Sequence, residues 1–252
     1  MIRFHTQPLQ HQHAHNTPWH QHPEAQLYVV ERGMILVETR EQQWAVMPGT
    51  LGWFPPGTDH AARVPSSVKG MSFYLDGANF PATAAVFAAN DFLRALLLRL
   101  ASPAPAQPEN YHSHLMTLLF DELALTPTLP LHLPLPTDRR LRNIADMLLN
   151  PEGCRLSQPE LAQQWGISPR TLSRLFSQET GMRFSQWRQQ SRLITSLSLL
   201  DKGLPVGEVA WRCGYDNTSA FIAAFRLRFG VTPGRMQERT FTDPPTPLSL
   251  AP

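Results

Sequence analysis

Arginine and hydroxyl side chains recur at short spacing between Ser168 and Gln178, where the sequence is Ser-Pro-Arg-Thr-Leu-Ser-Arg-Leu-Phe-Ser-Gln. The planar guanidinium group of arginine can donate paired hydrogen bonds to a phosphate or to the edge of a guanine. Serine and threonine hydroxyls can add single hydrogen bonds to either group. If these residues share an exposed face, that face has the chemistry needed to contact a nucleic acid.

A helix beginning near Ser168 would place these residues on one face. Ser168 followed by Pro169 is typical of a helix start. The spacing of Leu172, Leu175 and Phe176 predicts an inward stripe. The residues expected to face outward are Arg170, Thr171, Ser173, Arg174, Ser177 and Gln178.

A shorter helix is expected directly before this one. Ser157-Gln-Pro-Glu160 has the arrangement of a capping box, so a helix should begin there, bury Leu161 and Trp165, and end at Gly166. Two short helices joined by a glycine turn, the second bearing exposed arginine, form the helix-turn-helix arrangement that places its second helix in a DNA major groove. A helical hairpin packed on another element is the alternative.

The same pattern returns farther along the chain. Gly214 follows Gly166 by 48 residues, and Asn217 follows Ser168 by 49. Asn217 is therefore expected to cap the second helix of a second copy. The inward residues of that helix are predicted to be Phe221, Phe225 and Phe229. A continuous helix over residues 184–201 would hold the two copies at a fixed separation, and a tandem pair indicates DNA binding far more strongly than one copy.

Charge is unevenly divided along the chain. Residues 1–137 carry 7 Lys or Arg and 10 Asp or Glu, whereas residues 138–252 carry 15 and 10, although the whole chain has a net charge of only +2. Positive charge gathered in one part can neutralise phosphates and release counterions. Double-stranded DNA is thus the expected partner of the second part, with an ordinary solvated surface as the alternative reading of charge alone.

The segment from Asp138 to Arg239 resembles the DNA-binding domain of the AraC/XylS family of transcription regulators. The matching residues are Leu161-Ala162, Gly166-Ile167-Ser168-Pro169-Arg170-Thr171-Leu172-Ser173-Arg174-Leu175-Phe176, Gly181, Arg192-Leu193, Val209-Ala210, Gly214-Tyr215, Phe221, Phe225 and Phe229-Gly230-Val231-Thr232-Pro233. The resemblance implies two reading helices that enter successive major grooves about 34–36 Å apart on one face of the DNA.

The resemblance also implies roles for individual residues. Base-reading positions are held by Arg170, Thr171, Ser173 and Arg174 in the first unit and by Thr218, Ser219 and Ala223 in the second. Phosphate contacts are expected from Ser177, Gln178, Asn217, Arg226 and Arg228. Arg174 is the main expected base reader, through guanine O6 and N7, and a phosphate contact is its alternative. Ala223 stands where family members often have a long polar or basic residue, so the second unit is expected to depend more on DNA shape.

The part of the chain before residue 126 has a different pattern. Short apolar runs over residues 26–73, separated by Gly, Pro and polar turns, indicate an all-β unit. Apolar residues at helical spacing predict helices over 82–100 and 112–123. Residues 126–137 contain four prolines and are expected to form an extended connector rather than a core element.

Two short stretches resemble the conserved motifs of cupins, which are double-sheet β-barrels. They are His20-Gln21-His22 with Gly33, and Pro48-Gly49 followed by Pro55-Pro56-Gly57-Thr58-Asp59-His60. The resemblance implies a metal site at His20, His22 and His60, with Gln26 near the place of the usual acidic ligand. Such a site could hold a divalent transition metal. The other expectation is a small-molecule effector pocket lined by these four residues and Tyr28.

The expected fold class is two domains, an all-β cupin-like barrel with appended helices (α+β) followed by an all-α tandem helix-turn-helix domain. Its segments are an effector-binding and dimerisation domain at 1–125, a Pro-rich linker at 126–137, a DNA-binding domain at 138–239 and a flexible tail at 240–252. By analogy with the family, the helices at 82–100 and 112–123 would form a homodimer surface.

The function expected from this organisation is that of a non-enzymatic, sequence-specific DNA-binding transcription regulator, an activator or a repressor, whose promoter binding a small molecule modulates. Two alternatives stay open. One is a metal-dependent cupin enzyme fused to a DNA-binding module, for which Gln26 supplies no general base. The other is DNA binding that needs no ligand.

Cysteine usage and hydropathy indicate the compartment. Cys154 and Cys213 are the only cysteines and lie in segments that are predicted to be helical, so neither a disulfide framework nor a cysteine metal site is expected. The first fifteen residues contain no apolar signal-peptide core, and no run reaches the roughly 18 apolar residues of a spanning helix. A cytoplasmic protein with no membrane partner is expected.

Overall fold

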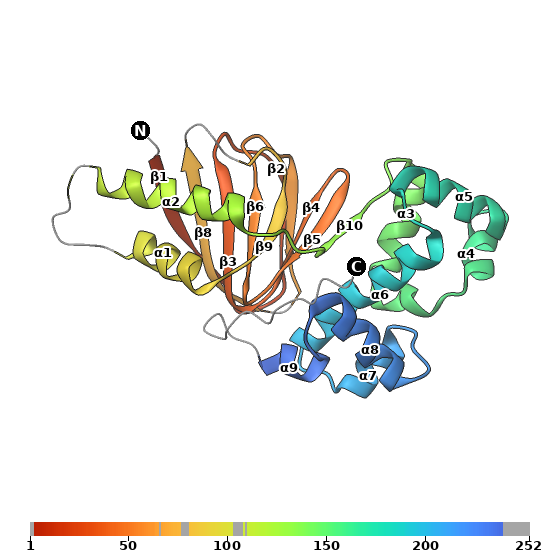
Figure 1. Ribbon diagram of the computed structural model, residues 1–252. Helices are drawn as coiled ribbons and strands as arrows, with labels where there is room; N and C mark the ends of the chain where they lie inside the picture. The colour runs from red at the N-terminus through yellow and green to blue at the C-terminus, as the bar shows by residue number, and fades with distance from the viewer. Residues whose placement is uncertain (1–2, 66, 77–80, 103–107, 109, 239–252) are drawn as a thin grey trace. The chain divides into compact units, whose positions relative to one another are not determined.

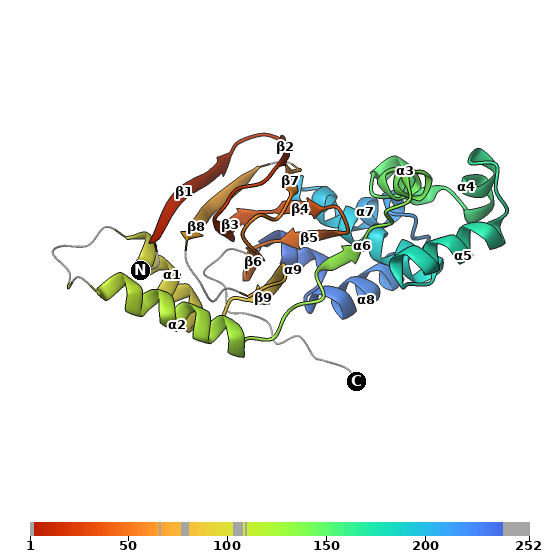
Figure 2. The same ribbon diagram turned by 90° about the horizontal axis from the view of Figure 1, so that it is seen from above.

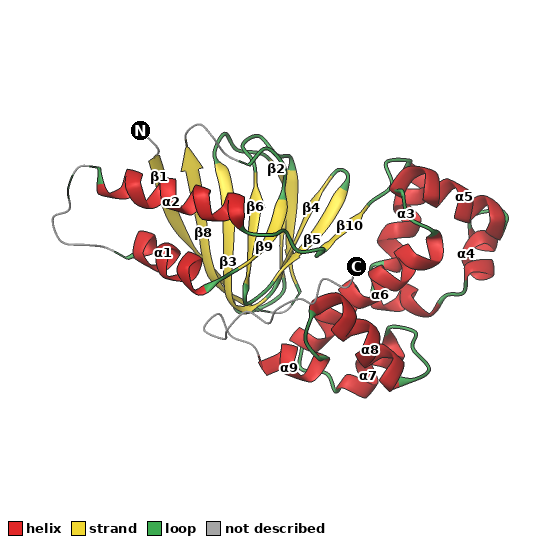
Figure 3. Cartoon of the chain, viewed as in Figure 1, coloured by secondary structure: helices red, strands yellow, loops and turns green. Residues whose placement is uncertain are grey.

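The computed structural model describes residues 3–65, 67–76, 81–102, 108 and 110–238. The chain divides into two compact units, the first comprising Met1–Val37 and Trp44–His132 and the second Glu38–Gln43 and Leu133–Glu238. Figure 3 shows the strands gathered in the first unit and an almost entirely helical second unit. The predicted tail at 240–252 lies outside the described residues.

Two five-stranded sheets make up most of the first unit (Figures 1 and 2), and the residues of the second sheet within Glu38–Gln43 and Leu133–Pro134 are grouped with the second unit. In spatial order, the first sheet contains β1 (Arg3–His11), β8 (Val68–Asp76), β3 (Ala25–Gly33), β6 (Thr50–Phe54) and β9 (Ala85–Ala88). The second contains β10 (His132–Pro134), β5 (Gln42–Val46), β4 (Ile35–Thr39), β7 (His60–Val64) and β2 (His15–His20). The all-β prediction for this part of the chain is confirmed.

Two helices, α1 (Asp91–Ala101) and α2 (Tyr111–Leu125), cover the outer face of the first sheet (Figure 1). Leu97 of α1 and Leu119 of α2 belong to the same buried cluster as Phe73 of β8. Because each fully buried side chain of this size contributes about 1.5–3 kcal/mol, this layer ties the helices firmly to the sheet.

The predicted helix over 82–100 is wrong in its first part. Residues 85–88 form β9, in which Phe87 is opposite Leu51 of β6. The helix begins only after Asn90, whose side-chain oxygen accepts a hydrogen bond from the backbone N–H of Leu93 at 2.7 Å. The apolar residues before Asn90 suit a buried strand as well as a helix, and pairing with β6 decides between them.

The segment 126–137 takes part in a core, contrary to expectation. Its leucines alternate with other residues, and Leu131, Leu133 and Leu135 are buried. Strand β10 lies within it at the edge of the second sheet, the position in which proline is tolerated because no ladder hydrogen bond is lost. The alternation of leucines with other residues indicates a strand, but the four prolines led to the prediction of a connector.

The second unit is helical, as predicted. Its helices are α3 (Arg139–Leu148), the 3₁₀ helix η1 (Pro151–Arg155), α4 (Gln158–Gln164), α5 (Pro169–Thr180), α6 (Phe184–Asp201), α7 (Val206–Arg212), α8 (Thr218–Phe229) and α9 (Pro233–Glu238). The continuous helix expected over 184–201 is confirmed as α6, which has ten buried residues and packs against α3, α5, α7 and α9. No helix in the described part of the chain has both the length and the apolar character needed to cross a membrane.

Candidate functional site

The first helix-turn-helix unit is formed by α4 and α5, and local sequence signals set both helix starts. Ser157 accepts a hydrogen bond from the backbone N–H of Glu160, whose carboxylate in turn accepts from the backbone N–H of Ser157 at 2.6 Å. Gly166 makes the turn at a φ of +65°, and Ser168 caps α5 by accepting from the backbone N–H of Thr171 at 3.1 Å. The predicted capping box and turn are confirmed.

Three of the predicted contact residues form an exposed ridge along α5. Arg170, Arg174 and Gln178 are spaced four residues apart and all three are exposed. Arg174 Nη1 donates to Gln178 Oε1 at 3.0 Å, which aligns the two side chains. The ridge therefore presents two guanidinium groups and an amide in one row.

The predicted hydroxyl contact residues of α5, Thr171, Ser173 and Ser177, are half-buried and already have partners within the protein. Ser173 Oγ accepts from Gln158 Nε2 at 2.7 Å, the Thr171 hydroxyl lies 2.8 Å from that of Ser168, and Ser177 donates to the backbone oxygen of Met182 at 3.1 Å. Ser173 can still donate its own hydrogen. These hydroxyls thus support the arginine ridge more than they extend it.

The second helix-turn-helix unit is formed by α7 and α8, joined by a turn at Gly214 with a φ of +74°. Asn217 caps α8 by accepting from the backbone N–H groups of Ser219 at 2.7 Å and Ala220 at 3.3 Å. The predicted base-reading residues Thr218, Ser219 and Ala223 are exposed. The exposed face of α8 near its start therefore offers two hydroxyls and a methyl group, without a charge.

The two arginines of α8 differ in their surroundings. Arg226 is exposed, whereas Arg228 is half-buried with its guanidinium 6.0 Å from the centre of the Phe229 ring. Burial lowers the pKa of Arg228 to about 10, so it remains protonated at neutral pH. Arg226 is the one with its charge open to solvent.

A pair of arginines on α6, which we did not predict as site residues, holds η1 against the central helix. Arg192 Nε and Nη2 donate to the backbone oxygen of Cys154 at 3.1 and 2.9 Å, and Arg188 donates to that of Leu156. Burial lowers the pKa of Arg188 to about 10, which still leaves it cationic at neutral pH. Their spacing of four residues within an otherwise inward face of a helix was the only sequence signal.

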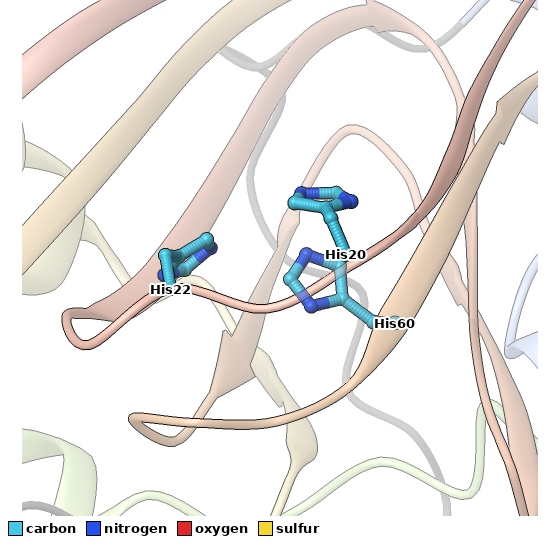
Figure 4. A group of neighbouring side chains, drawn as sticks. All are labelled: His20, His22 and His60. Atoms are coloured by element: carbon cyan, nitrogen blue, oxygen red, sulfur yellow. The ribbon is translucent and has the colours of Figure 1, made fainter.

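In the β-sheet unit of the chain, the three histidines implied by the resemblance to cupins come together. One ring nitrogen of each of His20, His22 and His60 lies within 4.8 Å of the others, and Figure 4 shows the three rings around a common space. His20 and His22 are half-buried and His60 is fully buried. Burial lowers the pKa of His60, which favours its neutral form.

A cavity of about 210 Å³ lies beside this cluster, inside the first unit. Of the predicted pocket residues, His20, Gln26 and Tyr28 line the cavity, whereas His22 and His60 do not. His22 is linked to it through Gln26, whose side-chain oxygen lies 3.2 Å from His22 Nε2. Tyr74 also lines the cavity, and its hydroxyl accepts a hydrogen bond from Gln26 at 2.9 Å. Burial raises the pKa of both tyrosines, so both stay protonated.

Comparisons with known proteins agree with the division of the chain into two units. A family model described as a helix-turn-helix domain matches residues 161–239, and one described as an AraC-like ligand binding domain matches residues 8–125. The HTH-type transcriptional regulator NimR of Escherichia coli is 34% identical over 232 residues, covering 91% of this chain and 85% of NimR.

Two further similarities cover one part of the chain each. The HTH-type transcriptional regulator RipA of Corynebacterium glutamicum is 36% identical over 115 residues, which is 46% of this chain and 33% of RipA. A crystal structure of an AraC-type regulator from Chromobacterium violaceum, 25% identical, covers 39% of this chain and 89% of its own with a TM-score of 0.36. From the length of the NimR match and the two family models, the chain belongs to the AraC family of helix-turn-helix transcription regulators, with an AraC-like ligand-binding domain ahead of its DNA-binding domain.

Proposed function

We propose that this regulator reads promoter DNA mainly through α5 and acts in the cytoplasm, where that DNA lies. The observation that carries the proposal is the exposed ridge of Arg170, Arg174 and Gln178 on the second helix of a capped helix-turn-helix unit. A major groove admits an α-helix, and arginine can bind guanine O6 and N7 together. Arg174 lies in the middle of the ridge and is assigned to a base, with Arg170 beside it.

We assign α8 mainly to positioning. Thr218, Ser219 and Ala223 can offer hydroxyl contacts and a methyl contact to bases, but no bidentate pairing. Asn217, Arg226 and Arg228 are assigned to phosphates, as are Ser177 and Gln178 in the first unit. The second helix-turn-helix unit then fixes the position of the protein along the DNA, and its sequence preference depends on DNA shape.

The effector is proposed to be a small polar molecule held in the cavity of the first unit. The cavity volume of about 210 Å³ limits the size of the molecule, and hydrogen-bonding groups of His20, Gln26 and Tyr74 supply its contacts. Such a molecule changes DNA binding only if it binds one arrangement of the protein more tightly than another. The relatives are transcription regulators, and no catalytic role is assigned to the cavity.

Mapping the DNA fragments that the full chain binds in the cell tests this function. Enrichment of a few discrete promoters is the expected result, and their neighbouring genes would point to the class of effector. A chain whose first reading helix, α5, is disabled by substitution of Arg170 and Arg174 together serves as the control. Binding spread evenly over the chromosome, with no discrete promoter enriched, would contradict the proposal.

The substitution Arg174→Ala tests the assignment of a base reader. We expect it to weaken binding to the preferred site by about 1–3 kcal/mol and to relax the preference at one base pair, because a bidentate guanine contact is lost. Selection of binding sites from random DNA, followed by titration of the selected site, measures both effects. An unchanged preference would reassign Arg174 to a phosphate.

Arg226→Ala provides the matched comparison, since it removes an exposed arginine from the other reading helix. It is expected to weaken binding to all DNA about equally, without changing the preferred sequence. The slope of log affinity against log salt concentration should become less steep by about 1, as expected for the loss of one phosphate contact. A change in base preference here, rather than in the Arg174 variant, would reverse the assignment of the two helices.

We propose that the protein forms a homodimer through α1 and α2. Four large apolar side chains on these helices are exposed, namely Phe92, Leu98, Leu118 and Leu125. Leu118→Glu is expected to weaken dimerisation at least about tenfold, because it would bury an unpaired carboxylate. Sedimentation equilibrium measures the change, and Leu227→Glu, at an exposed leucine of α8, is the control. A wild-type chain that sediments as a monomer would contradict the proposal.

A further inference from the structure

Gln158 joins the two helices of the first helix-turn-helix unit. It is the first residue of α4, and its Nε2 lies 2.8 Å from the backbone oxygen of Pro169 and 2.7 Å from Ser173 Oγ, both on α5. The capping box holds the start of α4, and Ser168 caps α5, so both ends of this bridge are fixed by neighbouring residues. Gln158 is half-buried and is not among the residues that the sequence predicted to contact DNA.

The contact with Pro169 fixes the orientation of the Gln158 amide. A carbonyl oxygen can only accept a hydrogen bond, so the Gln158 atom beside it is the nitrogen and not the amide oxygen. One hydrogen of this NH₂ group points to the Pro169 oxygen, and the other is donated to Ser173 Oγ. Ser173 is therefore the acceptor in its bond with Gln158.

The hydroxyl hydrogen of Ser173 has no acceptor among the described residues. A hydroxyl that already accepts a hydrogen bond becomes a stronger donor, because the two bonds polarise each other. The second lone pair of the oxygen can still accept, but a partner that donates there leaves the hydroxyl hydrogen unsatisfied once water is displaced, which is costly. Ser173 is thus prepared to meet an outside acceptor.

Ser173 lies beside the arginine ridge of α5. It follows Arg170 by three residues and precedes Arg174 directly, and both arginines are exposed. Residues three apart on a helix are neighbours on its surface. When the ridge enters a major groove, the Ser173 hydroxyl enters with it, and a base edge is the nearest source of an acceptor.

We propose that Gln158 determines the base specificity of Ser173: by donating to the Ser173 oxygen, it makes the hydroxyl a donor, which selects a base with a major-groove acceptor and rejects cytosine. Guanine offers N7 and O6, adenine N7 and thymine O4, whereas cytosine presents only its N4 amino donor. Gln158 acts through Ser173 and needs no base contact of its own. The inference rests on the proposed function, since it requires α5 in the major groove.

The first test is Ser173→Ala, with binding sites selected from random DNA by the full chain. For the wild-type chain, we expect one position beside the base read by Arg174 from which cytosine is excluded. Ser173→Ala should admit cytosine there and weaken binding to the selected site about two- to tenfold, which corresponds to one net hydrogen bond. Equal weakening on all DNA would assign the hydroxyl to a phosphate and overturn the proposal.

Two substitutions of Gln158 should change the polarity of the Ser173 hydroxyl in different ways. Gln158→Met keeps the length of the side chain but donates nothing, so Ser173 can donate or accept and cytosine should be admitted. Gln158→Glu supplies a carboxylate that only accepts. It should take the Ser173 hydrogen and turn the preference towards cytosine or adenine, whose amino groups donate. Gln163→Glu, at an exposed residue of the same helix, is the control for charge and should leave the preferred sequence unchanged.

A purely structural role for Gln158 predicts a different result. If its bond to Pro169 only held α5 in place, Gln158→Met would weaken binding to all DNA alike, whether or not Ser173 is present. We expect instead that Gln158→Met changes the base preference of the wild-type chain and leaves that of Ser173→Ala unchanged, because the hydroxyl through which it acts is gone. Continued exclusion of cytosine by Gln158→Met, or the same change in both backgrounds, would overturn the proposal.

Circular dichroism shows whether each variant is folded, and Arg174→Ala separates this inference from the proposed function. If Arg174→Ala relaxes the base preference and Gln158→Met does not, α5 remains the reading helix and only the role of Gln158 is contradicted. A wild-type chain that selects no sequence contradicts both.

Discussion

Gly214→Ala is expected to lower the free energy of unfolding of the helical unit by about 2–5 kcal/mol. Gly214 adopts a φ of +74°, a conformation that costs an L-residue about 1–2 kcal/mol. A methyl group there would lie 2.7 Å from the backbone oxygen of Cys154 and 2.7 Å from Arg192 Nη2. The Cys154 oxygen is backbone and cannot turn aside, and moving Arg192 would break its hydrogen bonds to that same oxygen, so overpacking adds about 1–3 kcal/mol.

Gly166→Ala is the matched control for this prediction. Gly166 occupies the equivalent turn of the first unit with a φ of +65°, but a methyl group there would meet no atom within 4 Å. Its substitution should therefore cost only the conformational part, about 1–2 kcal/mol. Urea unfolding of the full chain, followed by helical circular dichroism, measures both. Equal losses for the two variants would contradict the close contact with Cys154.

The tandem helix-turn-helix arrangement was predictable because the signals that specify it are local. Ser157, Glu160 and Ser168 cap helices with their own near neighbours, and the turn glycines adopt positive φ within their own loops. No partner distant in sequence is needed to decide these starts and turns. The exposed face of α5 follows from the same helical period, except that the pattern did not distinguish the exposed Arg174 from the half-buried Ser173.

The elements that were mispredicted depend on partners elsewhere in the chain. Residues 85–88 become a strand because β6 lies beside them, and β10 forms because β5 offers it an edge. A short apolar run suits a helix or a strand equally well until such a partner is known. The contact of Arg192 with Cys154, 38 residues away, was hidden for the same reason.

The histidine cluster lies between these cases. The resemblance to the two cupin motifs singled out His20, His22 and His60 as one group, and the structure places their rings next to one another. The carbonyl partner of each Nδ1 could not be predicted, since it depends on ring orientation and on the local turn. Those carbonyls fix the orientation of the three rings.

Phe176→Ala is expected to have the largest effect on stability, about 3–5 kcal/mol. The ring of Phe176 is fully buried and packs edge-on against Phe184 at 5.0 Å and Trp187 at 5.1 Å, both on α6. The loss combines the apolar area withdrawn from water, a cavity and two aromatic contacts worth about 0.5–1.5 kcal/mol each. Urea unfolding of the full chain measures it, with Leu227→Ala, at a leucine 79% exposed, as a control that should change stability by less than about 0.5 kcal/mol.

The effect on DNA binding should follow from the same contacts. Phe176 fixes α5 on α6, so its loss should weaken DNA binding even at low temperature, where the variant remains folded. Phe176→Leu keeps much of the buried volume but loses both aromatic contacts, so it should cost about 1–3 kcal/mol, less than Phe176→Ala, with nearly unchanged DNA binding. If Phe176→Ala is destabilised but binds DNA like the wild type when folded, then α5 does not depend on this packing for its position. In that case the cap at Ser168 and the turn at Gly166 would be enough to present Arg174 to the groove.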